Sequence, residues 1–250
     1  MVWIGARYVF PSTFSYRVPY FSSSYAISAP TPSPSTVKLA LVASAISRRG
    51  DPSKGSGFFE QIKTSSVAFE LPERLSIFNA FVKRLKQKRK GGEDKGRDKE
   101  KRQDITGVRT GFERTFGIRG YVLYGGPLAV YIDVSPALAT DIEEAFQAIG
   151  YFGTSDSICR CVKLEKRTPD LRRSPRRHTP EKESLSELPS GIPFILTDLT
   201  KNSTFDSVNP YLTTRLEPEK QLEHVSYIFP LKALEKAQDH VVYALQPFEK

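Results

Sequence analysis

The spacing of apolar residues predicts an α+β fold for this chain of 250 residues. Val2–Phe10 and Leu128–Val134 are rich in β-branched and aromatic residues, which is typical of strands. Ala137–Ile149 carries an apolar stripe at helical spacing, opposite acidic residues. The composition, 39% hydrophobic and 26% charged, is that of a globular protein and excludes a chain that is disordered throughout.

The first part of the chain predicts a strand, a long loop, a helix and a second strand. The loop, Pro11–Pro34, is dense in Ser, Pro, Tyr and Phe, and loops of this length are usually functional. Ser35–Arg48 is apolar on nearly every side, so we expect a buried helix that is capped by Ser35 and ended by Gly50. Ser65–Leu71 is the second expected strand.

The middle of the chain predicts an insertion, residues 81–124, between the second and third strands. Leu75–Leu85 has apolar residues at helical spacing, which predicts a short amphipathic helix. Lys86–Gln103 is dense in charge, and Thr106–Tyr124 combines glycine, arginine and aromatic residues. After it, Leu128–Val134, Ala137–Ile149 and Ser157–Leu164 predict a strand, a helix and a strand.

This order, β-α-β, an insertion and β-α-β, predicts a ferredoxin-like (RRM-like) βαββαβ domain over residues 1–164. Its crossovers would place both helices on one face of a four-stranded antiparallel sheet. Residues 165–190 form a basic polar linker, and residues 191–250 are expected to be a small β-rich C-terminal part. The elements expected there are strands at Ile192–Leu196, His224–Phe229 and His240–Gln246, with a helical turn at Leu231–Lys236.

The net charge of +9 is concentrated in two segments. Lys83–Arg102 holds 11 basic and 4 acidic residues, and Arg160–Lys182 holds 9 basic and 3 acidic residues. Such segments attract nucleic acid by releasing its counterions. They are also compatible with solvated loops that only aid solubility.

Candidate catalytic and metal-binding residues are few. His178, His224 and His240 have no metal-like spacing, and Cys159 and Cys161 are too few thiols for a zinc site. No Walker, HExxH or GxSxG motif occurs, so we expect no cofactor and no metal. A histidine paired with lysine or tyrosine could still cleave RNA. No apolar run reaches the roughly 20 residues of a membrane span, and we expect a cytoplasmic protein.

Sheet-face stacking of RNA bases is not the mode that the sequence favours. Leu128–Val134 lacks the RRM signature and has one aromatic residue, Tyr131. Arg109, Arg114 and Arg119 instead alternate with aromatic and glycine residues, a pattern suited to phosphate forks and base stacking. An ordinary hairpin with surface arginines would have the same pattern.

Three short blocks resemble the Cas-five family, the RAMP-type subunits of type I CRISPR surveillance complexes (Cascade). Pro32–Leu41 resembles the entry to the family's first helix, PxPSxxKGAL, with Leu39 in place of the usual glycine. Ile77–Leu85 is similar to the NAFxxKRL segment of archaeal subtype A members, and Ile149–Ser157 to the IGxxGxSES turn. The blocks fall within residues 1–164, and the tail resembles the family in being β-rich.

The resemblance implies a ferredoxin-like domain with an inserted hairpin, or thumb. It implies a subunit that holds the 5′ handle of CRISPR RNA. The expected partners are CRISPR RNA, the Cas-seven backbone subunit, the large subunit and, through the complex, target DNA. Most members are not enzymes. One subtype cleaves precursor RNA with a Tyr, Lys and His set that we cannot place on matching positions here. The alternative is a metal-independent endoribonuclease that depends on His224 or His240.

The expected RNA-binding residues come from four places in the chain. The long first loop offers a ring for stacking and an arginine fork, although both side chains could equally contact the core or a partner. The turn after the second helix offers N–H groups to a phosphate, or is only structural. The full set is Tyr16, Arg17, Lys38, Lys83, Arg84, Lys86, Lys88, Arg109, Arg114, Arg119, Gly153, Thr154 and Ser155.

Overall fold

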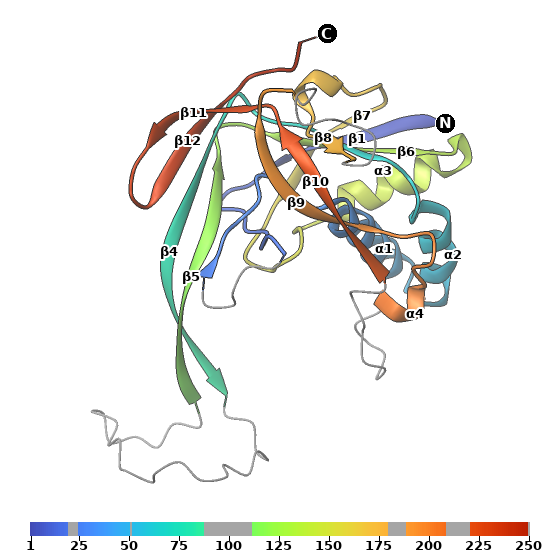
Figure 1. Ribbon diagram of the computed structural model, residues 1–250. Helices are drawn as coiled ribbons and strands as arrows, with labels where there is room; N and C mark the ends of the chain where they lie inside the picture. The colour runs from blue at the N-terminus through green and yellow to red at the C-terminus, as the bar shows by residue number, and fades with distance from the viewer. Residues whose placement is uncertain (20–24, 51, 88–111, 180–188, 209–220, 250) are drawn as a thin grey trace.

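Antiparallel sheets with a few helices make up the computed structural model, which describes residues 1–19, 25–50, 52–87, 112–179, 189–208 and 221–249 (Figure 1). The fold is α+β, as the sequence predicts. The elements are β1 (Val2–Val9), β2 (Tyr25–Ala26), α1 (Pro34–Arg49), α2 (Pro52–Ile62), β3 (Val67–Glu70), β4 (Arg74–Gln87), β5 (Phe112–Tyr124), β6 (Leu128–Val134), η1 (Pro136–Leu138), α3 (Ala139–Ala148), β7 (Arg160–Glu165), η2 (Leu171–Arg173), β8 (Arg176–His178), β9 (Ile192–Leu199), α4 (Phe205–Val208), β10 (Leu222–Phe229), β11 (Leu231–Lys236) and β12 (His240–Leu245).

The central sheet has four strands in the order β3-β6-β1-β7, and every neighbouring pair is antiparallel. β1 pairs with β6 from Val2↔Val134 onwards, and a bulge between Arg7 and Tyr8 interrupts its pairing with β7. Since side chains alternate across a strand, Ile4 and Tyr8 point to one face, where both are fully buried.

Helices α1 and α3 cover that buried face. Val37 of α1 and Phe146 of α3 lie in the same core as Ile4 and Tyr8, and the Tyr8 hydroxyl donates to the Phe146 carbonyl at 2.6 Å. The N-cap of α1 is Ser33 rather than the expected Ser35. A proline at the first turn of the helix has no N–H that needs a partner, so the cap moves before Pro34.

Helix α2 is an element that the sequence did not indicate. Its sequence contains two glycines, which weaken a helix in isolation. Packing supplies the reason for one of them, because a Cβ on Gly55 would lie 2.4 Å from Ile46 of α1. Burial of Phe58, Phe59 and Ile62 then stabilises the helix against the core.

The helix expected at Leu75–Leu85 is wrong, because these residues lie in strand β4. Its register with β5 runs unbroken from Leu75↔Tyr124 to Gln87↔Phe112. The apolar spacing fits a helix, but the partner strand lies tens of residues away and supplies the hydrogen bonds. The helical turn expected at Leu231–Lys236 is wrong as well, since these residues form β11 and pair with β12.

The two remaining sheets join distant parts of the chain. The five-stranded sheet, in the order β11-β12-β4-β5-β2, extends the hairpin of β4 and β5 with strands from the C-terminal end. The three-stranded sheet, β8-β10-β9, packs Leu196, Val225 and Phe229 into the main core. None of the helices in the described ranges is both long enough and apolar enough to cross a membrane.

Candidate nucleic-acid interface

The hairpin of β4 and β5 projects from the body as a two-stranded arm (Figure 1). At its root, β12 pairs with β4 as far as Phe78, and β2 pairs with β5 at Ile118 and Arg119. Among the described residues no further strand flanks the hairpin toward its tip. The edges of the ribbon are therefore unpaired among the described residues beyond this root, and the face that carries Phe81 and Phe116 is exposed.

An apolar row begins in the core and continues onto the open arm. Leu75 and Ile77 are buried at the root, whereas Phe81, on the same face, is 70% exposed. Phe81 stacks on Phe116 of β5, which is 57% exposed, with ring centres 5.7 Å apart and planes 20° apart. Exposed apolar surface of this kind marks a binding site more often than scattered single side chains do.

A cation lies beside the stacked rings. The Nζ atom of Lys83 lies 5.8 Å from the centre of the Phe116 ring, on the same face. A flat aromatic surface with an adjacent ammonium suits a nucleobase and its phosphate. The sequence predicts Lys83 but not Phe81, because the apolar spacing of Leu75–Leu85 places Phe81 on the core stripe of a helix.

The other predicted basic residues of the insertion are only partly covered by the structure. Arg84 and Lys86 lie in β4 and Arg114 lies in β5, with side chains outside the described set. Lys88 and Arg109 lie outside the described residues. The prediction for these five residues stays a prediction.

The turn after α3, which holds the predicted RNA-binding residues Gly153, Thr154 and Ser155, lies near the root of the hairpin. Arg119 of β5 contacts Asp156 at 3.7 Å, which links the arm to Gly153–Asp156. Gly153 has φ +73°, a conformation that favours glycine, and Thr154 and Ser155 are exposed. The turn is anchored by Ser157, whose N–H donates to the Thr154 carbonyl at 2.9 Å. The structure thus brings Arg119 and the turn together.

Tyr16 is half-buried and packs against the core. Its hydroxyl lies 3.0 Å from Thr197 Oγ1, and its N–H donates to Ser28 Oγ at 2.9 Å. These contacts hold the first loop against β9. Arg17, the next residue, is exposed and forms an isolated bridge with Ser28.

The expectation that Lys38 binds RNA is corrected by the structure, because Lys38 is only 1% exposed. Its Nζ donates to the Lys63 carbonyl at 2.9 Å and to Asp198 Oδ1 at 2.7 Å. Burial lowers the pKa of Lys38, and the carboxylate of Asp198 opposes that shift. Lys38 therefore fastens α1 to β9 in the interior, where RNA has no access.

The face of the central sheet opposite the helices is occupied by the chain itself. The Tyr131 ring is fully buried over Gly5, where a Cβ would lie 2.2 Å from the ring. The Tyr131 hydroxyl donates to Glu165, and Arg167 covers the ring at 5.1 Å. Bases therefore cannot stack on Tyr131 as they do on the sheet of an RRM.

Two carboxylates on this face are held ionised by arginines. Glu70 accepts from Arg167 at 2.7 Å, and Glu165 accepts from Arg7 at 2.7 Å, with both carboxylates 7% exposed. Burial opposes ionisation of Glu165, but hydrogen bonds from Arg7 and Tyr131 outweigh it and lower the pKa to about 2. The network is structural, since its groups satisfy one another.

The two histidines of the cleavage alternative, His224 and His240, lie in different sheets. His224 lies in β10 of the three-stranded sheet, whereas His240 begins β12 of the five-stranded sheet and contacts Asp239 at 2.9 Å. In the described part of the chain, no three His, Cys, Asp or Glu side chains cluster as metal ligands would.

Comparison with known proteins identifies the family. No protein-family model matches the sequence. A CRISPR-associated protein Cas5 from Archaeoglobus fulgidus is 33% identical over 219 residues, which cover 84% of this chain and 86% of that protein.

Two solved structures are also similar. A crystal structure of a CRISPR protein from Archaeoglobus fulgidus has a TM-score of 0.49 and 12% identity, covering 100% of this chain and 96% of that one. A chain of a CRISPR RNA-guided surveillance complex has a TM-score of 0.42 and 14% identity, covering 99% and 91%. The assignment depends on the sequence relative, which confirms the resemblance of the three sequence blocks. The chain belongs to the Cas5 family of CRISPR-associated proteins.

Proposed function

We propose that this Cas5 chain is a non-catalytic subunit of a type I CRISPR surveillance complex. In this proposal it binds the 5′ handle of CRISPR RNA and joins the Cas-seven backbone subunit to the large subunit. The observation that carries the proposal is the projecting hairpin of β4 and β5, with the exposed Phe81–Phe116 stack beside Lys83. Stacking and cationic groups on one open face are what single-stranded RNA requires.

The proposal includes a ferredoxin-like βαββαβ unit over residues 1–164, with the hairpin as its thumb. The strand order β3-β6-β1-β7 supports this, because a helix follows β1 and another follows β6. The hairpin is inserted in the sequence between β3 and β6, so it adds an RNA-binding arm without interrupting the central sheet.

Binding of the handle is tested by filter binding, with the backbone subunit present. CRISPR RNA with the 5′ handle is compared with the same RNA without it. We expect tighter binding of the RNA that carries the handle. Equal affinity for both RNAs would contradict recognition of the handle, while leaving general RNA binding intact.

The contribution of the basic hairpin is tested by the salt dependence of binding. The slope of log K against log salt is negative, and each phosphate contact that is lost reduces its magnitude by about 0.7 for a single strand. We expect a shallower slope when Lys83, Arg84, Lys86 and Lys88 are all replaced by alanine. The matched control replaces four exposed lysines elsewhere, Lys166, Lys201, Lys232 and Lys236. Equal slopes in both variants would mean that the hairpin charge is not in contact with RNA.

Absence of cleavage is part of the proposal and has its own test. Purified protein is incubated with precursor RNA in EDTA. We expect intact RNA. Discrete products with 2′,3′-cyclic phosphate ends, lost on replacement of either histidine, would favour the endoribonuclease instead.

A further inference from the structure

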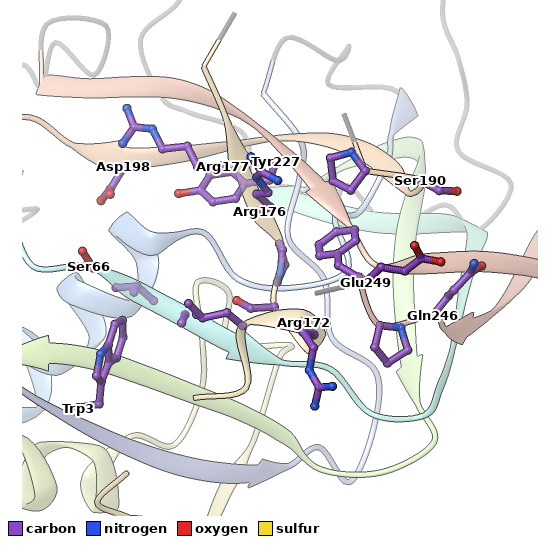
Figure 2. A pocket seen from close by; sticks show the side chains of 18 of the residues that line it. Trp3, Ser66, Arg172, Arg176, Arg177, Ser190, Asp198, Tyr227, Gln246 and Glu249 are labelled. Carbon is purple, nitrogen blue, oxygen red and sulfur yellow. The ribbon is translucent and has the colours of Figure 1, made fainter. Parts of the chain in front are cut away.

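A groove of about 880 Å³ lies between the central sheet and the three-stranded sheet. Figure 2 shows Trp3 and Ser66 on one side of it and Arg176, Arg177 and Tyr227 on the other. This volume is at the upper end of the range of ligand sites in proteins. The proposed RNA-binding arm does not use the groove.

Two outer strands border the groove, β3 of the central sheet and β8 of the three-stranded sheet. The carbonyl of Ser66 points to β6, where it accepts from the Asp133 N–H at 2.9 Å. Because backbone groups alternate along a strand, the N–H and C=O of Val67 point the other way, into the groove. An outer strand in this state is a template for pairing with another chain.

The chain itself already occupies the outer edge of β3 beyond Val67, with η2 and the residue after it. Farther along β3, the Phe69 N–H donates to Ser174 Oγ at 3.1 Å and the Leu71 N–H to the Arg173 carbonyl at 3.3 Å. On the opposite side of that segment, the Phe248 N–H donates to the Arg172 carbonyl at 2.9 Å. The backbone N–H groups on the outer edge of β3 thus already donate to acceptors from another segment, and Val67 is the position on this same edge that lines the groove.

Exposed arginines give the groove a preference of charge. Arg172, Arg176 and Arg177 line it and are exposed, with Arg172 held by Asp170 at 2.9 Å. Of the two carboxylates in the lining, Asp198 is engaged by Lys38 and Glu249 is exposed, so cationic side chains outnumber acidic ones. Arg177 pairs with Glu223 at 3.1 Å, but both side chains are exposed and such a pair contributes little. Replacing Glu223 by a ligand carboxylate as the partner of Arg177 therefore costs little free energy.

We infer that this groove binds an extended acidic peptide segment of a partner protein, which adds a strand to the edge of β3 at Val67. Its backbone would donate to the Val67 carbonyl and accept from the Val67 N–H, as in β-strand addition. The phosphates of RNA accept hydrogen bonds but do not donate them, so RNA could reach the Val67 carbonyl only through a 2′-hydroxyl or a base, without the paired donor and acceptor of a peptide group. The inference does not rest on the proposed function, and it is tested without RNA.

The probe is a fluorescein-labelled octapeptide of alternating valine and aspartate, measured by fluorescence anisotropy against the full chain. We expect Val67→Pro to weaken binding about tenfold, the effect of one lost hydrogen bond. Proline is tolerated on an outer strand where the N–H faces away from the sheet. The matched control is Val67→Thr, which keeps the N–H and the branched side chain and should bind as the wild type does.

A second arm depends on charge and not on the backbone of β3. The double variant Arg176→Glu and Arg177→Glu should lose the aspartate peptide and gain binding of the corresponding valine–lysine peptide. Circular dichroism establishes that each variant is folded. If the Val67→Pro variant does not fold, the charge exchange alone decides.

Three results would overturn the inference. One is equal binding of a peptide whose alternate backbone nitrogens are methylated. Another is unchanged affinity in the folded Val67→Pro variant together with no exchange of charge preference. The third is displacement of the peptide by oligouridylate that depends on Arg176 and Arg177, because the groove would then be a nucleic-acid site.

Discussion

The open face of the hairpin and the face of the central sheet opposite the helices contain similar residues in opposite states. On the sheet, Tyr131 is covered by Arg167 and bonded to Glu165, with the ring fully buried. On the hairpin, Phe81 and Phe116 stack on each other and remain mostly exposed, with Lys83 as the adjacent cation. An aromatic–cation pair with its own carboxylates stabilises the fold, whereas one with no carboxylate partner among the described side chains is available to a ligand.

The largest expected effect is a loss of stability when the packing beneath Tyr131, on the central-sheet face opposite the helices, is disturbed. Gly5→Val should destabilise the protein by about 3 kcal/mol, because the new side chain meets the Tyr131 ring and the core cannot absorb it. Urea denaturation measures the loss. The control is Gly57→Ala, where a Cβ meets no atom within 4 Å. Equal stabilities for the two variants would contradict close packing of Tyr131 on Gly5.

Removal of the Glu165 carboxylate from the same face should have the next largest effect on stability. Glu165→Gln removes one of the two carboxylates that neutralise Arg7 and Arg167, leaving them to share Glu70, and should cost about 2 kcal/mol near neutral pH. The pKa of Glu165 lies at about 2, below its ordinary value of 4.5, so the folded state binds its proton less readily than the unfolded state. This contribution is therefore complete above pH 4.5 and is lost as the pH falls toward 2.

The pH dependence separates that ion pair from a general packing effect. Unfolding free energy is measured by urea between pH 2 and pH 7 for both proteins. We expect the difference between wild type and the Glu165→Gln variant to shrink as the pH falls through this window. A constant difference would mean that the charge of Glu165 has no part in stability.

On the hairpin, Phe116→Ala should leave stability nearly unchanged and weaken RNA binding about tenfold, the effect of one lost stacking contact. Filter binding and urea denaturation measure the two quantities. Tyr151→Ala, at another exposed aromatic residue, is the control and should affect neither. A large loss of stability in the Phe116 variant would place the ring in the fold rather than in the interface.

The smallest expected effect is that of Lys83→Ala. It should reduce the salt slope of RNA binding by about 0.7, the contribution of one phosphate contact. Lys163→Ala on β7 is the control, because this lysine is exposed but belongs to the sheet-face network through Glu165. If both variants give the same slope, Lys83 on the hairpin contributes no more to RNA binding than Lys163 on the sheet does.

Local patterns in the sequence determined much of the body. The β-branched and aromatic residues of Leu128–Val134 predicted β6, and the apolar stripe of Ala137–Ile149 predicted the helix α3, because both signals depend on near neighbours in the chain. The glycine at position 50 ends α1 as expected, with φ 64°. The three short blocks identified the family, which the relative from Archaeoglobus fulgidus confirms.

The tertiary structure alone decided the rest. Leu75–Leu85 has helical spacing, but pairing with a distant strand made it β4 and turned Phe81 outward. Lysine is usually found on the surface, but Asp198 of β9 holds Lys38 in the interior. In each case the deciding partner is far away in the sequence, and such contacts leave no periodic signal near the residue that they control.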